Sequence, residues 1–316
     1  MDDRPLHVVT GALGYTGKSV ASGLLAAHGA DIRLRTLTNS PNRPNPFGDR
    51  LELAPMDFTD RAALVETLRG AEVLYNTYWV RFNHKLFTFA QAVANTKALF
   101  EAAKEAGVKR IVHVSILKPD EGRGLAYYDG KLELEQHLRR LGVPHSVVRP
   151  GVLFGRGDIL VNNIAWVLRH LPIFGVFGDG RYKLQPMHVD DMAALLIEQG
   201  ATTTDQTVDA VGPETFTYTE LVRTIAGIIG IKRPIVRVPA WLGYAVSRTL
   251  NPFVKDVIIT REEIAGLMRG LLFSDGDRVG ATRLSDWALR HRAELGRRYA
   301  SEVGRRIKRD VAYEMV

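Results

Sequence analysis

Two side chains that can exchange a proton stand four positions apart in the segment AYYDGKLELEQHL. The spacing of Tyr127 and Lys131 brings both side chains to one face of a helix. A tyrosine with a pKa of about 10 is a weak base at neutral pH. A neighbouring ammonium group favours the phenolate and lowers that pKa, which would allow the pair to act as a general acid or base. The alternative, which the spacing alone also fits, is an exposed helix face.

A second pattern, VVTGALGYTGKSV, places three glycines between an apolar run and an amphipathic segment. Between a strand and a helix, Gly11 would permit a tight turn, Gly14 the approach of a pyrophosphate, and Gly17 close packing of the helix on the strand. Free N–H groups at the start of the helix would bind the phosphates. We therefore expect a nicotinamide dinucleotide site here, the alternative being a tight turn without a ligand. The loop residues expected to line the site are Gly11, Leu13, Gly14, Tyr15, Thr16 and Gly17.

The choice between NADP and NAD depends on the end of the second expected strand, LRTLTNSPNRPN. A carboxylate there would accept a hydrogen bond from the ribose 2′-hydroxyl of NAD, whereas cations would bind the 2′-phosphate of NADP. Asn39 stands where the acid would be, and Lys18 and Arg43 are nearby cations, so NADP is favoured and NAD stays open. After the third strand, Asp57 is placed to bind the adenine amino group, beside Phe58, or only to cap a turn.

The elements that must position these residues follow a regular alternation. Short apolar runs rich in β-branched residues alternate with longer segments of helical periodicity, which predicts an α/β fold with a doubly wound parallel sheet. The expected strands are 6–10, 32–38, 51–55, 73–76, 110–115 and 145–149, and the expected helices are 18–28, 60–68, 88–106 and 127–141. Ligands of such sheets bind beyond the carboxyl ends of the strands.

Two domains are expected from the length and from the loss of this alternation after Gly151. We predict a dinucleotide-binding core of residues 1–157 and 182–212, and a smaller substrate lobe of residues 158–181 and 213–316. In the segment LQPMHVDDMAALLIEQ, a strand should be followed by a helix with Asp190 or Asp191 as its N-cap.

Composition excludes several other classes of protein. The chain of 316 residues is 46% hydrophobic and 24% charged, as in folded globular proteins. It contains no cysteine, and His84, His113 and His188 lack ligand spacing, so no metal site is expected. The N-terminal residues do not resemble a signal peptide and no apolar run could span a membrane, which predicts a cytoplasmic protein.

The excess of positive charge, +7 in total, gathers near the end of the chain. Residues 290–309 are expected to form a helical surface element without a nucleic-acid role, because Tyr299 is their only aromatic residue. The segment WLGYAVSRTLNPFVKD mixes apolar and basic residues, as a substrate cover, a dimer face or a membrane-surface element would.

Taken in order along the chain, these motifs resemble the extended or atypical branch of the short-chain dehydrogenase/reductase superfamily. This branch includes epimerase/dehydratase-like and NmrA-like proteins and the dinucleotide-binding accessory subunit of respiratory complex I. TGALGYTG is similar to its TGxxGxxG loop, Tyr127 and Lys131 to its YxxxK pair, and VVRPGVLFG to its Pro-Gly segment. The resemblance covers about residues 5–212.

The resemblance implies roles for individual residues. Tyr127 would be the general acid or base, Lys131 its pKa modulator and a ribose ligand, and Ser115 a donor to the substrate oxygen. Asn95 would hold a relay water. The resemblance also implies further contacts with the cofactor. These are Asn76, at the end of the fourth strand, and Pro150 and Gly151, which would close over the nicotinamide. The sequence departs from the pattern after Ser115, where Ile116 and Leu117 replace hydroxyl residues.

The leading interpretation is an NAD(P)-dependent oxidoreductase that moves a hydride between nicotinamide and a carbonyl or alcohol carbon. A non-catalytic redox sensor or respiratory-complex accessory protein is the first alternative. A nucleotide-sugar epimerase or dehydratase is the second, disfavoured because the interval from Ser115 to Tyr127 is about half of what such enzymes have. Tyr78 and Trp79 indicate a flat or apolar small-molecule substrate, with core packing as the alternative. Contact with a membrane surface, without a span, and the oligomeric state are left open.

Overall fold

The protein is described by a computed structural model that covers residues 3–316, with the exception of the Leu250 side chain. The chain divides into two compact units. One contains the residues up to Arg149 together with Met192–Val208, and the other contains Pro150–Asp191 together with Asp209–Val316. The return to the first unit thus begins at Met192 instead of residue 182, because the strand before it, β10, pairs with β7 of the second unit.

A seven-stranded sheet in the order β11-β6-β5-β4-β1-β2-β3 is the centre of the first unit. Neighbouring strands from β3 to β6 pair in parallel. The strand order reverses between β1 and β4, the point where doubly wound sheets bind their ligands. The strands are β1 (Leu6–Thr10), β2 (Arg33–Thr38), β3 (Glu52–Pro55), β4 (Ala71–Asn76), β5 (Arg110–Val114), β6 (His145–Pro150) and β11 (Gln206–Ala210). The predicted α/β doubly wound fold is confirmed, and the six expected strands lie within two residues of their expected bounds.

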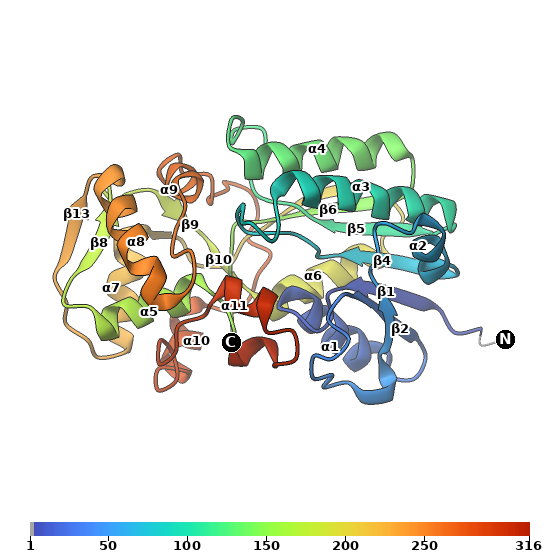
Figure 1. Ribbon diagram of the computed structural model, residues 1–316, viewed down its shortest axis with the longest axis horizontal. Helices are drawn as coiled ribbons and strands as arrows, with labels where there is room; N and C mark the ends of the chain where they lie inside the picture. The colour runs from blue at the N-terminus through green and yellow to red at the C-terminus, as the bar shows by residue number, and fades with distance from the viewer. Residues whose placement is uncertain (1–2) are drawn as a thin grey trace. The chain divides into compact units, whose positions relative to one another are not determined.

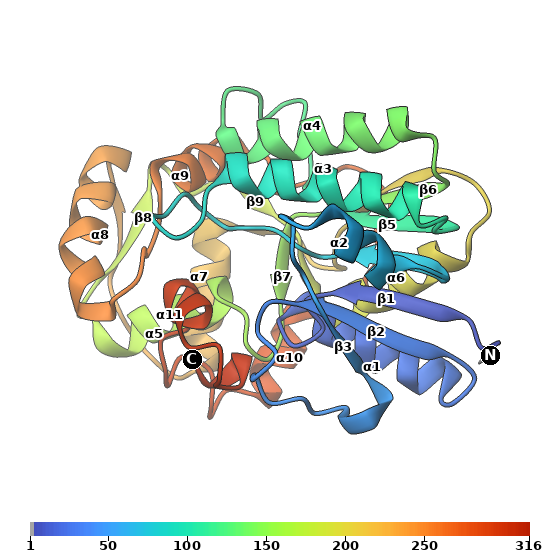
Figure 2. The ribbon, with the colours of Figure 1, turned by 45° about the vertical axis from the view of Figure 1, so that its right-hand side comes forward.

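Helices cover both faces of this sheet, as Figures 1 and 2 show, with α2, α3 and α4 on one face and α1 on the other. The helices are α1 (Thr16–His28), α2 (Arg61–Leu68), α3 (Phe89–Glu105), α4 (Ala126–Leu141) and α6 (Val189–Ala201), with a short 3-10 turn η1 (Gly48–Arg50). Asp60 and Thr88 cap α2 and α3 by accepting hydrogen bonds from backbone N–H groups of the first turn. These caps explain why the expected helix starts at 60 and 88 are one residue early.

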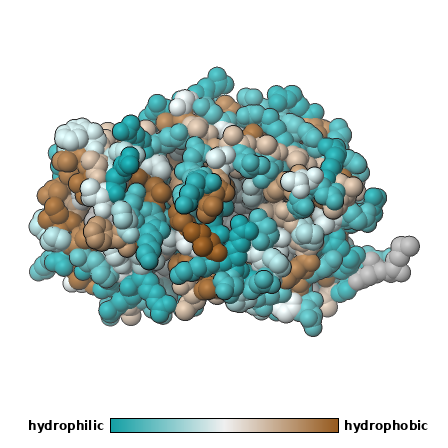
Figure 3. Space-filling model, viewed as in Figure 1, coloured by the Kyte–Doolittle hydropathy of each residue, from teal (hydrophilic) through white to brown (hydrophobic). Residues whose placement is uncertain are grey.

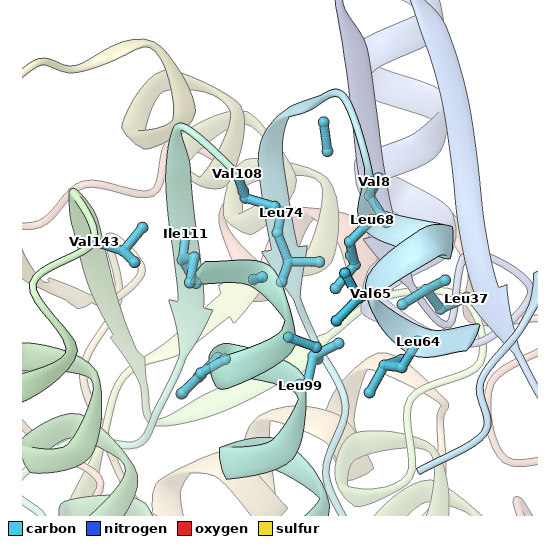
Figure 4. Close-up of a cluster of buried hydrophobic side chains, with 14 of the residues drawn as sticks. Val8, Leu37, Leu64, Val65, Leu68, Leu74, Leu99, Val108, Ile111 and Val143 are labelled. Carbon is cyan, nitrogen blue, oxygen red and sulfur yellow. The ribbon is translucent and has the colours of Figure 1, made fainter. Parts of the chain in front are cut away.

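The main apolar core of the first unit lies between the sheet and the helices α2, α3 and α4. Buried aliphatic side chains of β1, β4 and β5 meet those of the helices, as Figure 4 shows. The side chains with no exposed surface include Val8, Leu68, Leu74, Leu99 and Ile111. A core of this kind holds the carboxyl ends of β1, β4 and β5 in fixed positions, and the loops that follow them begin from a rigid edge.

The second unit consists of short strand pairs and helices. Its strands are β7 (Val152–Phe154), β8 (Phe174–Phe177), β9 (Lys183–Leu184), β10 (Pro186–His188), β12 (Phe216–Thr217) and β13 (Ile235–Val238). Its helices are α5 (Leu160–His170), α7 (Tyr218–Ile228), α8 (Ala240–Val254), α9 (Arg261–Met268), α10 (Leu284–Arg290) and α11 (Glu302–Ile307), with the 3-10 turn η2 (Tyr313–Met315). Within the described residues, every helix is too short or too polar to cross a bilayer.

Two expectations for this unit are wrong. Neither Asp190 nor Asp191 is the N-cap of α6, because the helix begins at Val189 and both lie within its first turn. The Asp191 carboxylate accepts hydrogen bonds from the backbone N–H groups of Ala281 and Thr282. The basic end is not a continuous helix, because Gly296 adopts a φ of +72° and its backbone touches α5. Arg305 is buried, donates to the carbonyl oxygen of Gly157 at 2.8 Å and is not part of a solvated face.

Candidate functional site

The glycine loop leaves β1 at the switch point and turns at once into α1. Gly11 has a φ of +69°, and its carbonyl oxygen accepts a hydrogen bond from the N–H of Gly14 at 2.8 Å. A Cβ on Gly17 would stand 2.7 Å from the carbonyl carbon of Gly11 and 2.8 Å from the oxygen of Thr10. Only glycine at this position lets α1 pack directly on the end of β1, as the sequence predicts.

The start of α1 has the properties of an anion-binding site. Tyr15 is its N-cap, and within this described helix no side chain caps the end and no acidic residue stands in the first turn. A Cβ on Gly14 would meet only the oxygen of Gly11, at 3.1 Å, so its outer side is open to a ligand. Leu13 is 4% exposed, and Thr16 is half-buried. The loop therefore fits a pyrophosphate held by backbone N–H groups and the helix dipole.

A hollow of about 390 Å³ lies between α1 and the loop after β2. Lys18 and Arg50 both line it, together with Ser22 and Phe47. Arg50 was not expected from the sequence, because it lies in the turn η1, which a loop separates from the end of β2. Of the two residues that were expected, Asn39 is exposed and Arg43 is 7% exposed, and their contacts with a cofactor stay predictions.

Asp57 and Phe58 follow β3 at the same edge of the sheet. The Asp57 carboxylate accepts hydrogen bonds from the hydroxyl and the N–H of Thr59, at 2.7 and 2.8 Å, and these bonds hold the pKa of the carboxyl below its ordinary value. With these bonds the Asp57 side chain caps the turn that follows β3, which was the alternative role for this residue. Adenine binding by Asp57 stays a prediction. The Phe58 ring lies 5.3 Å from the ring of Tyr78.

The end of β4 is tied to the end of β1 by side chains. Asn76 has no exposed surface, and its amide oxygen lies 3.2 Å from the Thr10 hydroxyl oxygen and accepts a bond from the N–H of Tyr78. Its amide nitrogen lies 3.1 Å from Nδ1 of His113. Burial holds the pKa of His113 well below its ordinary value, which keeps the imidazole neutral. The Asn76 side chain supports the site from beneath, and a direct contact with the cofactor stays a prediction.

Asn95 on α3 donates a hydrogen bond to the Tyr78 hydroxyl at 2.9 Å. The amide oxygen of Asn95 accepts a bond from Gln91, one turn earlier on the same helix. Asn95 is therefore bonded to two side chains, and its amide keeps one further N–H and one further lone pair. The relay water stays a prediction.

Tyr127 and Lys131 lie on one face of α4, with Trp79 packed against both. The Trp79 ring makes an edge contact with Tyr127, with 5.7 Å between centroids, and the Lys131 ammonium lies 4.3 Å from the Trp79 centroid. Lys131 donates to the carbonyl oxygen of Val114 at 2.7 Å. Burial lowers the pKa of Lys131 to about 7, against the opposing effect of Glu135. Tyr127 and Lys131 thus share one helix face as the spacing predicts, and Trp79 contacts both of them as well as Phe89.

Glu135, one turn beyond Lys131, organises a buried network that sequence reasoning missed. Its carboxylate accepts the Ser115 hydroxyl at 2.6 Å and the Arg149 guanidinium through two bonds, at 2.9 and 2.6 Å. Arg139 adds a third donor. The spacing of four residues between Lys131 and Glu135 was the sequence signal that could have placed Glu135 on the same face of the helix as Lys131. The network fastens α4 to the ends of β5 and β6, and Ser115 gives its hydrogen to Glu135.

Pro150 ends β6 and Gly151 follows it, both within the second unit, and their closure over a nicotinamide stays a prediction. Among residues 3–316, no group of three histidine, aspartate or glutamate side chains could hold a metal ion.

Comparison with known proteins defines the domain. Residues 11–160 match the model of an NAD(P)H-binding family. These residues are an NAD(P)H-binding domain. Its cofactor is therefore NAD or NADP, and the cofactor prediction is confirmed at this level.

Curated relatives fall into two functional groups. The chain is 25% identical over 218 residues to the 40 kDa subunit of mitochondrial NADH-ubiquinone oxidoreductase of Neurospora crassa, covering 68% of this chain and 57% of that protein. It therefore spans little more than half the length of that relative. It is also 27% identical over 241 residues to a ceramide reductase of Caulobacter vibrioides, covering 75% of each chain.

Among solved structures, the triphenylmethane reductase of Citrobacter sp. in complex with NADP(H) has a TM-score of 0.74 at 17% identity. The match covers 90% of this chain and 99% of that one. This likeness shows the same fold. The curated relatives, a complex I subunit and a reductase, are of the kinds that the resemblance inferred from the motifs includes.

Proposed function

We propose that this protein is an NAD(P)H-dependent oxidoreductase that transfers a hydride between nicotinamide and a carbonyl or alcohol carbon, with Tyr127 as the proton donor or acceptor. The observation that carries the proposal is the placement of Tyr127 and Lys131 on one face of α4, next to the end of β5. The glycine loop follows β1 at the same carboxyl edge of the same sheet. A phenol and an ammonium at this edge are groups that a proton transfer to or from a substrate would use.

The chain's own residues would hold the dinucleotide at several points. Backbone N–H groups at the start of α1 would bind the pyrophosphate, and Lys18 with Arg50 would bind a 2′-phosphate in the hollow that they line. These two cations favour NADP over NAD. When bound, the dinucleotide supplies the hydride donor or acceptor carbon of the nicotinamide.

Lys131 would serve the reaction by its charge. With a pKa lowered to about 7, the ammonium is only partly charged at neutral pH, because burial disfavours the ion. An anionic phosphate or phenolate beside it would raise that pKa again and complete the charge. We therefore propose that Lys131 becomes an effective partner of Tyr127 once the cofactor is bound.

Flat, apolar compounds are the substrates that the aromatic cluster fits. Trp79, Phe89 and Tyr127 contact one another edge-on or in stacks, and Tyr78 and Phe58 lie beside them. The relatives named for reductase activity act on a ceramide and on triphenylmethane compounds. We propose an aromatic or long-chain carbonyl compound as the substrate.

A second candidate is a cofactor-binding protein without turnover, like an accessory subunit of a respiratory complex. The observation in its favour is that Ser115 donates to Glu135 and Asn95 donates to Tyr78. Two of the four expected catalytic side chains are thus engaged in bonds within the protein.

Transfer of deuterium separates the two candidates. Wild-type protein should be incubated with NADPH or NADH deuterated at C4 of the nicotinamide, together with aromatic ketones and a triphenylmethane dye. Each acceptor takes the hydride at carbon, which retains the label for mass spectrometry. We expect labelled product, formed faster from NADPH. Cofactor binding by calorimetry, with no labelled product from any acceptor, would replace the enzyme with the non-catalytic candidate.

A further inference from the structure

Helix α8 of the second unit exposes a row of large apolar side chains. Trp241 is 71% exposed, Phe253 84%, Val246 50% and Leu242 38%. At 3.6 residues per turn, these four side chains fall within an arc of about 140° on one side of the helix. Isolated exposed apolar residues are ordinary, but a continuous row along a helix marks a surface that another apolar phase covers.

The opposite side of α8 is fixed against the second unit. A Cβ on Gly243 would stand 2.6 Å from the ring of Phe177 and 3.3 Å from Val238, and Ser247 is 5% exposed. The exposed row therefore cannot turn inward without breaking the contacts of α8 with β8 and β13. Figure 3 shows brown side chains gathered where Figure 1 places β13 and α8.

Along the sequence, this row is accompanied by basic residues and not by acidic ones. Between Glu220 and Asp256 the sequence contains no acidic residue, and Asp256 is buried, with its carboxylate bonded to the N–H groups of Glu302 and Val303. Arg248 and Lys255 are exposed and border the row along one edge of α8. Arg237 is exposed on the adjoining strand β13, beside Val236, which is 36% exposed.

We propose that the exposed face of α8 and the adjoining edge of β13 bind the surface of an anionic lipid bilayer. The combination of an exposed tryptophan and phenylalanine with arginine and lysine at the border is the chemistry of helices that lie in the plane of a membrane interface. Each cation near an anionic surface adds attraction, and no carboxylate between residues 221 and 255 opposes it. The face rests on the second unit alone and is independent of the proposed catalysis.

Vesicle sedimentation tests the proposal directly. The full-length protein should sediment with vesicles of phosphatidylcholine containing roughly one-third phosphatidylglycerol, much more than with phosphatidylcholine alone. Trp241→Ser with Phe253→Ser should weaken binding by at least about tenfold. Arg237→Gln with Arg248→Gln should weaken it by roughly tenfold or more, and raised salt should reproduce that loss.

Matched controls come from exposed residues elsewhere in the second unit. Leu289 and Ile307 are 51% and 60% exposed, so Leu289→Ser with Ile307→Ser removes exposed apolar side chains outside the α8 face, although a smaller area. Arg290→Gln with Arg292→Gln removes the same charge from the basic end. Both controls should bind vesicles as the wild type does. The proposal fails if the controls lose as much binding as the α8 variants, or if no vesicle binds. It also fails if light scattering without lipid shows a dimer that Trp241→Ser with Phe253→Ser dissociates, because the face would then belong to a second copy.

Discussion

Burial of the Lys131 ammonium makes the free energy of unfolding depend on pH. The pKa is about 7 in the folded protein and 10.5 for an unperturbed lysine, so between these values the unfolded chain binds more protons than the folded one. Below pH 7 both states are protonated and the folded protein carries the full cost of the buried charge. The free energy of unfolding should therefore rise with pH across this window.

Comparison with a second lysine isolates the effect. Relative to Lys131→Met, the wild type should gain stability on the order of 3 kcal/mol between about pH 7 and 10, measured by urea unfolding. Lys104 also donates to a carbonyl oxygen, that of Leu141, but is exposed, so Lys104→Met should show no such difference from the wild type. Parallel pH profiles for wild type and Lys131→Met would show that the ammonium is not desolvated.

Single residues also mark the limit of what the sequence could predict. The i, i+4 spacing correctly placed Tyr127 and Lys131 on one face. It could not show that Trp79 packs against both of them or that Ser115 donates to Glu135, because these contacts join residues from separate elements. Arg50 entered the candidate site in the same way, through a loop whose path follows no periodic pattern.

At the scale of elements, the joint between β1 and α1 should be sensitive to a single methyl group. A Cβ on Gly17 would meet backbone atoms of Thr10 and Gly11 that cannot move without separating the strand from the helix. Gly17→Ala should therefore destabilise the protein by about 2 kcal/mol or more. Gly227 on α7 has open space around its Cβ position, so Gly227→Ala should be neutral or stabilising by up to about 1 kcal/mol. Urea unfolding that ranks the two variants equally would contradict this packing.

The elements of the first unit were predictable because local signals agree there. Apolar β-branched runs form the strands, and Asp60 and Thr88 cap the starts of α2 and α3, where the helical pattern begins. The elements of the second unit were not, because its strands are as short as two residues and pair with partners far along the chain. β13 pairs with β8, and β12 with β9, across intervening helices.

At the scale of the whole molecule, long-range polar contacts organise the second unit in ways that no pattern reveals. Asp256 accepts bonds from the first N–H groups of α11, and Glu214 binds the hydroxyl and N–H of Ser285. Such contacts turned the expected basic helix near the end of the chain into a folded segment with a buried Arg305. The division into a regular nucleotide-binding unit and an irregular second unit explains why the cofactor could be inferred while the substrate could not.

The central claim, that Tyr127 provides the proton for hydride transfer, is tested most directly by comparing two acceptors in one variant. Reduction of a ketone needs a hydride and a proton, whereas a triphenylmethane dye cation needs only the hydride. Tyr127→Phe should slow ketone reduction by about a hundredfold or more and leave dye reduction and NADPH affinity nearly unchanged. Tyr128→Phe, the same change in the buried neighbouring residue, should slow neither reaction. Equal losses with both acceptors, or unchanged ketone reduction in Tyr127→Phe, would contradict the account.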